Sequence, residues 1–288
     1  MKYITEDFVK AYLPKRPDDA NKGTMGTLLN ISGSYAMAGA CTLSALSALR
    51  SGVGLLKVAL PYSIYPIVAS TVYEAVFMPL ADSDSGTVDN NSLDFLIDTA
   101  RKSSAVMLGC GLKLCDETID FVKSFVAACN TPMLIDADGI NAISLNIDVL
   151  KDSTADIVIT PHPKEMSRLT GLSVEYIQSN RIEVAEKTAR KLGVTLVLKG
   201  KKTVVTDGVR TRINKTGNSG MAKGGSGDVL SGIISSLMAQ GVDSFEACCI
   251  GVYVHGLSGD LASEYLSKTA MLPRDIINYL PQAFKTLE

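Results

Sequence analysis

The amino-acid sequence predicts an α/β fold in which helices cover both faces of a central, mostly parallel sheet, with antiparallel strands late in the chain. Short apolar runs rich in β-branched residues alternate with longer segments of helical spacing, which is the pattern of β-α-β units. The runs are apolar at almost every position, as is typical of parallel strands buried on both faces. Later in the chain, Asp207-Gly208 stands between two short strand-like runs and is a strong hairpin signal.

Six apolar runs are expected to form the parallel strands: Thr27–Ile31, Leu55–Ala59, Ala105–Leu108, Met133–Ile135, Ile157–Ile159 and Thr195–Leu198. The clearest connecting helices each end near a glycine or a proline: Ala38–Arg50, Thr118–Cys129 and Asn180–Leu192. The segments TVVTDG and VRTRIN are expected to form the two antiparallel strands. A glycine cluster and two further helices should follow them.

Composition limits the possible function classes. The chain has 288 residues, of which 46% are hydrophobic and 20% charged, as in an ordinary globular protein. The formal net charge of −2 and the absence of long Lys or Arg runs argue against nucleic-acid or membrane partners. Six cysteines include no C-x-x-C pair, and only two histidines accompany them, so we expect reduced, mostly buried thiols.

The organisation of the chain predicts one domain over residues 1–288, because no repeat or linker-like stretch divides it. The amino terminus is charged throughout and lacks the apolar core of a signal peptide or spanning helix. A cytoplasmic location is therefore expected.

The stretch KGGSGDVL (223–230) carries the main functional question. Apolar residues recur at helical spacing after Asp228, so the glycines stand at a helix N-terminus. Unpaired N–H groups and the helix dipole attract an anion there, and glycine allows close approach. Asp228 is either a reactive carboxylate or a simple helix cap, and this stretch alone leaves both interpretations open.

The loops that follow the strands add polar groups at the same expected edge, since ligands of open α/β sheets bind beyond the carboxyl ends of the strands. Each loop also has a plainer interpretation as a turn, a helix cap, an exposed loop residue or a solvated hairpin edge. The loops are Ser32–Ala40, which lacks the Rossmann glycine spacing, Gly109–Gly111, Asp136–Gly139, Thr160–Glu165 and Lys199–Thr203.

Together these groups suit phosphoryl transfer to a hydroxyl. Asp228 would accept the hydroxyl proton, and the amides of Gly224–Gly227 would hold the transferring group. Acidic residues at Asp136, Asp138 and Glu165 are candidate Mg²⁺ ligands, acting through water because Mg²⁺ keeps much of its hydration. The P-loop motif is absent, so a different kinase-like architecture is expected.

The motif K-G-G-S-G-D-V-L-S-G-I-I resembles G-G-[TS]-G-D-x-L-[AS]-G of the ribokinase-like superfamily. Within it, nearly the whole chain resembles the ADP- or ATP-dependent NAD(P)H-hydrate dehydratases. The stretches that carry this resemblance are N-K-G-T-M-G-T-L-L-N-I-S-G-S, D-A-D-G-I-N, T-P-H-P-K-E-M and L-K-G-K-K-T-V-V-T-D-G. Ser226 stands where many relatives have Thr, and Gly139 and Ile140 where they often have Ala and Leu.

The resemblance implies a repair enzyme that phosphorylates the ring hydroxyl of the S-form of hydrated NADH or NADPH, so that loss of phosphate regenerates the double bond. It implies Asp228 as base, with Gly225, Ser226 and Gly227 in the anion hole. It further implies Mg²⁺, ADP or ATP as co-substrate, and a homo-oligomer, with a tetramer as the assembly typical of the family. The implied nucleotide contacts are Lys199, Gly200, Lys201, Lys202, Thr203, Gly224 and Gly227, and the implied hydrate contacts are Ala40, Gly111, His162 and Asp228.

Two alternatives remain open at this point. A kinase for a vitamin precursor or sugar alcohol would use the same Asp228 and release a stable phosphate ester. A non-catalytic nucleotide sensor would need Asp228 only as a cap. Some relatives carry an epimerase domain ahead of the dehydratase, and the segment before Thr24 is expected to be too short for one. The preferences for ADP or ATP and for NADH or NADPH hydrate are not predicted.

Overall fold

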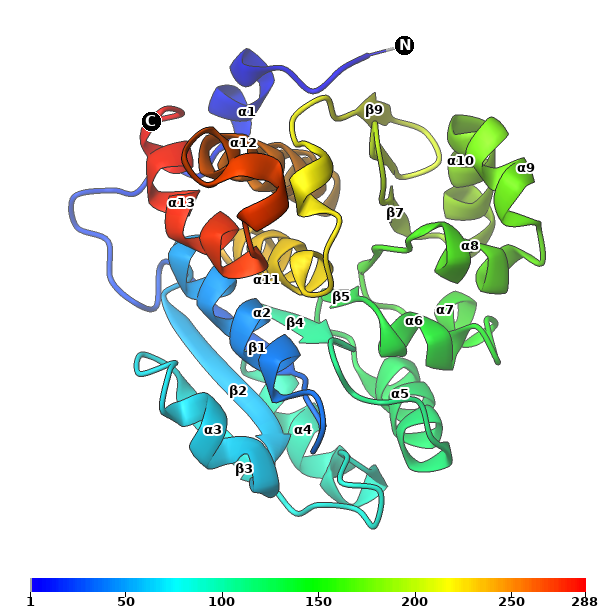
Figure 1. Ribbon diagram of the computed structural model, residues 1–288. Coiled ribbons are helices and arrows are strands. Elements are labelled where there is room, and N and C mark those ends of the chain that lie inside the picture. The colour runs from blue at the N-terminus through cyan, green and yellow to red at the C-terminus, as the bar shows by residue number, and fades with distance from the viewer. Residues whose placement is uncertain (1) are drawn as a thin grey trace.

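A computed structural model describes residues 2–288 and contains one continuous sheet (Figure 1). Its strands are β1 (Thr27–Ile31), β2 (Leu55–Pro61), β3 (Val76–Leu80), β4 (Ala105–Leu108), β5 (Met133–Ile135), β6 (Ile157–Ile159), β7 (Thr195–Leu198), β8 (Val204–Thr206) and β9 (Thr211–Ile213). Their order across the sheet is β3-β2-β1-β4-β5-β6-β7-β8-β9. Strands β1 to β7 pair in parallel, and β8 and β9 join in antiparallel pairs. The predicted fold class is confirmed.

The six predicted parallel strands all form, and β2 runs two residues further than predicted, to Pro61. The prediction missed β3, which lies at the edge of the sheet beside β2. Its burial is mixed, and Pro79 interrupts its sequence. A half-exposed edge strand lacks the apolar run of a central strand, and Pro is tolerated at such an edge. The two strands predicted around Asp207-Gly208 pair as expected.

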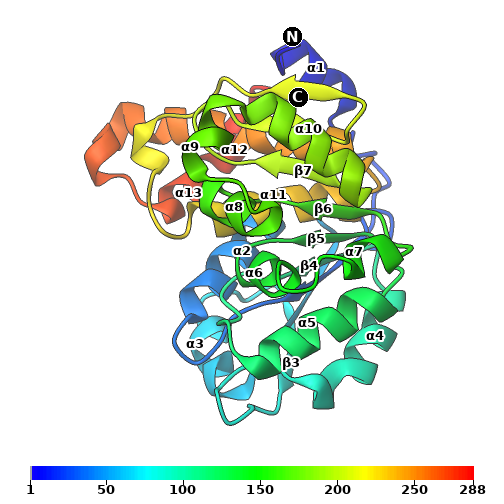
Figure 2. The same cartoon turned by 90° about the vertical axis from the view of Figure 1, so that its right-hand side faces the viewer.

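Helices cover both faces of the sheet. One layer comprises α1 (Glu6–Tyr12), α2 (Ala38–Arg50), α3 (Tyr65–Ala69), α11 (Ser226–Ala239), α12 (Ser244–Ala270) and α13 (Pro273–Lys285). The other comprises α4 (Leu93–Arg101), α5 (Asp116–Ala128), α6 (Asp138–Ile143), α7 (Val149–Asp152), α8 (Pro163–Thr170), α9 (Val174–Ser179) and α10 (Arg181–Leu192). Short 3-10 turns lie at Tyr62–Ile64, Asn90–Ser92 and Ser219–Met221. Figure 2 shows β7, β6, β5 and β4 stacked in that order.

Two hydrophobic cores result from the alternation of side chains along the strands. Leu28 and Met107 face the layer that contains α2 and α11, while their neighbours Leu29 and Leu108 face the layer that contains α5. Successive strand residues point to opposite faces, so a strand buried on both sides must be apolar at every position. This is the physical reason for the continuous apolar runs in the sequence.

The predicted helices also form, with small shifts at their ends. Helix α2 has the predicted bounds, α5 begins two residues earlier than predicted, and α10 begins at Arg181. Three helices follow the hairpin where two were predicted, because the C-terminal segment forms α13 as a helix separate from α12. No helix within residues 2–288 combines the length and apolar character needed to cross a bilayer.

Helices α2 and α11 pack with little space between them, and Gly232 allows this approach. A Cβ atom at Gly232 would overlap Ser47 Oγ and the carbonyl oxygen of Ser44 on α2. We expect Gly232→Ala to lower the free energy of unfolding by about 1–3 kcal/mol, since the two helices must separate. Urea unfolding measures this change.

Gly39→Ala is the matched control, because Gly39 is exposed in α2 and a Cβ there meets no atom within 4 Å. Alanine in an open helical position should leave the stability unchanged or raise it by up to about 1 kcal/mol. Equal losses in both variants would contradict the packing role of Gly232.

Candidate active site

The carboxyl edge of the sheet gathers residues from several of the predicted loops. Lys199, which follows β7, places its Nζ 2.6 Å from Oδ1 of Asp136, which follows β5. The N-terminus of α11 reaches the same place. A Cβ atom built on Gly227 would lie 3.4 Å from Lys199 Nζ and 3.6 Å from Asp136 Oδ2. The glycine turn, a lysine and a buried carboxylate therefore meet at one point.

The glycine cluster forms the start of α11. Gly225 is the N-cap residue of α11, and its φ of 99° is a left-handed conformation that favours glycine. Glycine has no side chain that could accept a capping hydrogen bond from the first turn. Asp228 lies at the third helical position, so the interpretation of Asp228 as an N-cap residue is wrong. The hydroxyl of Ser226 is buried and has no hydrogen-bond partner among the described residues. This turn offers first-turn N–H groups and a hydroxyl to an anion.

The environment of Asp228 favours the neutral form of its carboxyl group more than water favours that form in an exposed aspartate. Burial, and next the negative charge of Asp136, raise the pKa of Asp228 to about 6. Lys199 opposes this effect. A carboxylate with such a pKa is ionised at neutral pH and is basic enough to accept a proton, as general-base catalysis requires.

Asp136 has both carboxylate oxygens engaged. Oδ1 accepts from Lys199, and Oδ2 accepts from Ser231 Oγ at 2.8 Å, with Cys110 Sγ at 4.0 Å. The side chain is 1% exposed. Burial by itself would raise the pKa of Asp136, but Lys199 and the hydroxyl of Ser231 hold it below its usual value. Burial would lower the pKa of Lys199, and the carboxylates of Asp136 and Glu165 instead raise it.

His162 caps the N-terminus of α8, a role that was not predicted from the sequence. Its ring Nδ1 accepts from the backbone N–H groups of Lys164 and Glu165 at 3.1 Å each. The backbone N–H group of His162 donates to Glu165 Oε2 at 2.7 Å. This is a capping box with histidine in place of Ser or Thr. Burial, and then Lys199, lower the pKa of His162. The neutral ring therefore carries its proton on Nε2 and acts as a hydrogen-bond donor.

Metal binding was predicted for Asp136, Asp138 and Glu165, and Asp138 Oδ2 accepts from the Lys113 N–H group at 2.8 Å. Glu165 Oε2 accepts from the backbone N–H group of His162, and Glu165 Oε1 lies 3.4 Å from His162 Nε2. Burial raises the pKa of Glu165 to about 7, although the charge of Lys199 opposes this shift. Within residues 2–288, no group of three His, Cys, Asp or Glu side chains is placed to hold a metal ion. These residues do not form a metal cage, and their role as ligands through water stays a prediction.

Ala40 and Gly111 are neighbours at this edge, as the predicted hydrate pocket requires. A Cβ atom at Gly111, which has φ 66°, would lie 2.7 Å from Ala40 Cβ. The loops that hold them are joined by a hydrogen bond from Gly33 N–H to the Cys110 carbonyl at 2.8 Å. The hydroxyls of Ser32 and Ser34 are buried in the first of these loops without a hydrogen-bond partner among the described residues.

The three lysines of the predicted nucleotide loop point to different places. Lys199 turns inward and is 17% exposed, whereas Lys201 and Lys202 are exposed and line a separate cavity of about 400 Å³ together with Tyr3 and Arg181. Arg181 Nη2 also donates to the carbonyl of Leu198 at 2.8 Å. The loop is closed by Thr203 Oγ1, which donates to the Gly200 carbonyl at 2.9 Å.

Ser231 and Cys110 contact Asp136 and were not predicted as members of this site. Ser231 lies one turn after Asp228 in a buried helix, and a polar residue on the same helix face as Asp228 was the available signal. Cys110 was treated as an ordinary buried thiol, and it is buried. Its position near Asp136 depends on the pairing of β4 with β5.

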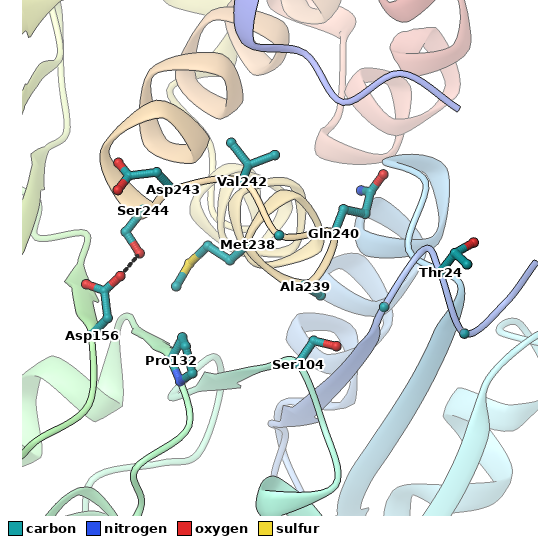
Figure 3. Close-up of a pocket in the computed structure, with 13 residues that line it drawn as sticks. Thr24, Ser104, Pro132, Asp156, Met238, Ala239, Gln240, Val242, Asp243 and Ser244 are labelled. Carbon is teal, nitrogen blue, oxygen red and sulfur yellow. Dashed lines mark hydrogen bonds between the residues drawn. The ribbon is translucent and has the colours of Figure 1, made fainter. Parts of the chain in front are cut away.

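A cavity of about 390 Å³ lies at the opposite, amino edge of the sheet (Figure 3). The end of α11, the start of α12 and the residues just before β1, β4, β5 and β6 line it. Asp156 accepts there from Ser244 Oγ at 2.6 Å. The predicted site residues do not line this cavity. The candidate active site is therefore the carboxyl edge.

Comparison with known proteins identifies relatives over the whole chain. A family model described as NAD(P)H-hydrate dehydratase matches residues 28–282. The bifunctional NAD(P)H-hydrate repair enzyme Nnr of Moorella thermoacetica is 37% identical over 287 residues, which are 99% of this chain and 54% of that protein. The ADP-dependent (S)-NAD(P)H-hydrate dehydratase of Bacillus subtilis is 32% identical and covers 99% of each chain. This chain thus spans about half the length of the bifunctional relatives.

A solved structure extends the similarity to three dimensions. The ADP/ATP-dependent NAD(P)H-hydrate dehydratase from Bacillus subtilis, co-crystallized with ATP/Mg²⁺, matches with a TM-score of 0.85 at 29% identity. The match covers 100% of this chain and 99% of that one. The two proteins share their fold along their full length.

The conformation of the glycine turn is open to a direct test. A Cβ atom at Gly225 would combine the left-handed φ with a contact of 2.7 Å to Leu43 Cδ1. We expect Gly225→Ala to lower the free energy of unfolding by about 1–3 kcal/mol. Its neighbour provides the control, because a Cβ atom at Gly224 meets no atom within 4 Å and Gly224→Ala should change stability little. Loss of stability in Gly224→Ala alone would show that the turn has a different conformation.

Proposed function

The chain belongs to the NAD(P)H-hydrate dehydratase family, and we propose that it uses ADP or ATP to restore the S-form of hydrated NADH or NADPH to the reduced coenzyme. The observation that carries this proposal is the position of Asp228 at the N-terminus of α11, beside the glycine turn and Lys199. A base for the acceptor hydroxyl then lies beside backbone amides and a cation that can hold the phosphoryl group.

The first step is phosphoryl transfer to the ring hydroxyl. As the hydroxyl oxygen bonds to the terminal phosphorus of the nucleotide, its proton passes to the carboxylate of Asp228. The bond to the bridging oxygen breaks, and the nucleotide leaves one phosphate shorter. The ring then loses inorganic phosphate as its C–O bond breaks, and loss of a proton from the adjacent ring carbon forms the double bond. Phosphorylation thus converts hydroxide, a poor leaving group, into a good one.

The surrounding residues hold these groups in place. The amides of Gly224, Gly225 and Gly227 would bind the transferring phosphoryl group, whereas the Ser226 N–H group donates to the Lys223 carbonyl at 3.2 Å. The ammonium of Lys199 would balance the charge of the phosphoryl group. Mg²⁺ bound with the nucleotide would neutralise phosphate oxygens, as this chemistry usually requires. Because the side chains at this edge form no metal cage, we assign the ion no protein ligand.

The pockets for the two substrates follow from the same arrangement. We propose that Ala40, Gly111 and His162 line the hydrate pocket, with the His162 Nε2–H group as a donor. We propose that Lys199, Gly200, Gly224 and Gly227 contact the nucleotide. Contacts from Lys201, Lys202 and Thr203 stay a prediction from the sequence, because both of these lysines line the separate cavity. That residues 1–288 form one domain, that the protein is cytoplasmic and that it assembles as a homo-oligomer remain predictions from the sequence.

Catalysis by Asp228 is tested with hydrated NADPH and ADP, by following the absorbance of the reduced nicotinamide. We expect the absorbance to appear with the wild-type protein and the turnover of Asp228→Asn to be about 10²–10⁴-fold lower, because the base is lost. The melting temperature should stay the same or rise, since the substitution removes a partly buried charge.

Asp120→Asn is the matched control, because Asp120 is an exposed residue in the middle of α5. It should keep wild-type turnover. A wild-type protein that consumes a vitamin alcohol and leaves the hydrate unchanged would show a kinase instead. Near-normal turnover in Asp228→Asn would mean that Asp228 is not the base.

The pH dependence of turnover gives an independent test of the same residue. Asp228 accepts a proton only when ionised, and its pKa is raised to about 6. We therefore expect kcat to be level above this pH and to fall about tenfold per pH unit below it. An acid limb near the ordinary aspartate value of about 3.9 would contradict the assignment.

A further inference from the structure

Lys199 and the glycine turn come from different parts of the chain, and Asp136 contacts Lys199 and lies next to the turn. Its Oδ1 holds Lys199 Nζ at 2.6 Å. Its Oδ2 accepts from Ser231 on α11 at 2.8 Å and lies 3.6 Å from the Cβ position of Gly227. The carboxylate of Asp136 thus joins the end of β7 to the first turns of α11.

Hydrogen bonds and close packing fix the backbone of Asp136, so its carboxylate can hold Lys199 in one position. Its N–H donates to the Leu108 carbonyl at 3.0 Å, and its carbonyl accepts from Gly139 N–H at 2.9 Å. Ala137 follows with φ 50°, a conformation that costs a non-glycine residue free energy. At Gly109, φ is 127° and a Cβ atom would overlap the Asp136 carbonyl oxygen. The two loops therefore fit against each other without free space at Asp136.

Lys199 has only one other acidic neighbour among the described residues that could bind its ammonium group. The carboxylate of Glu165 is its second acidic neighbour, at 3.9 Å, and is itself bound by the His162 N–H group. Without the charge of Asp136, the ammonium would move toward Glu165 or toward solvent and so away from Gly227. A displacement of about 1 Å in a positioned group is enough to cost as much as 10²-fold in rate.

We propose that Asp136 is a positioning residue that acts through Lys199, holding the ammonium beside the glycine turn where the transferring phosphoryl group binds. This inference rests on the proposed function, and it concerns the phosphoryl transfer step rather than the acceptor. It differs from the role of Asp136 as a metal ligand, because the carboxylate acts here on two protein donors, Lys199 and Ser231.

A double-mutant cycle tests this inference. We expect Asp136→Asn to lower kcat at least about tenfold, with KM for the hydrate changed less than about twofold. Lys199→Met should lower kcat at least as far. If Asp136 acts through Lys199, the double variant should match Lys199→Met within about twofold. The double variant also removes both charges, so it should fold even if a single variant with one unpaired buried charge does not.

Glu246→Gln is the matched control for the loss of a buried, paired carboxylate. Glu246 accepts from Arg210 Nη1 at 2.8 Å near the start of α12, away from the carboxyl edge. We expect both this variant and Asp136→Asn to lower the melting temperature, because each removes a charge that is paired in the fold. Only Glu246→Gln should keep wild-type kcat. An equal loss of kcat in the two single variants would show that Asp136 supports stability only.

Two further outcomes would overturn the positioning role. If the effects of Asp136→Asn and Lys199→Met multiply in the double variant, Asp136 does not act through Lys199. If higher Mg²⁺ concentrations restore the kcat of Asp136→Asn, Asp136 acts on the metal. Failure of the proposed function is seen separately, in the wild-type protein. If that protein phosphorylates another alcohol, the same cycle is measured on that reaction.

Discussion

The close packing of helix α11 is the constraint on which the rest of the site depends. This helix is buried along almost its whole length, against α2 on one side and α12 on another. Glycine makes both contacts possible, since Gly232 lies against Ser44 and Ser47, and a Cβ atom at Gly251 of α12 would come within 2.5 Å of Ile234. A helix held so tightly cannot slide or rotate freely. Its N-terminus is therefore fixed at the carboxyl edge.

Charge at this edge is arranged around that fixed end. Asp136 and Lys199 form a buried pair, and their opposite charges balance each other next to the glycine turn. Asp228 lies outside this pair, so burial and the charge of Asp136 act on it with less compensation. One carboxylate is thereby held ionised with a lowered pKa, while the other becomes a moderate base. The same residue type has two roles because the surroundings differ.

The local sequence was informative about the elements but not about the partners of their side chains. A capping box with Glu at its third position is visible in P-H-P-K-E, yet histidine is not a usual N-cap residue, so the role of His162 was missed. The three lysines after β7 look alike in sequence. Only the pairing of β7 with β6 and β8 turns Lys199 inward and leaves Lys201 and Lys202 in solvent.

The sequence by itself determined the six central parallel strands, the clearest connecting helices, the hairpin at Asp207-Gly208 and the helix that starts at the glycine cluster, because these depend on periodicity and on the backbone preferences of single residues. It did not reveal β3, whose exposed edge position gives no apolar run. The tertiary structure alone decided which charges meet. Asp136 and Lys199 are 63 residues apart, and their contact arises only when β5, β6 and β7 align their carboxyl ends in one sheet.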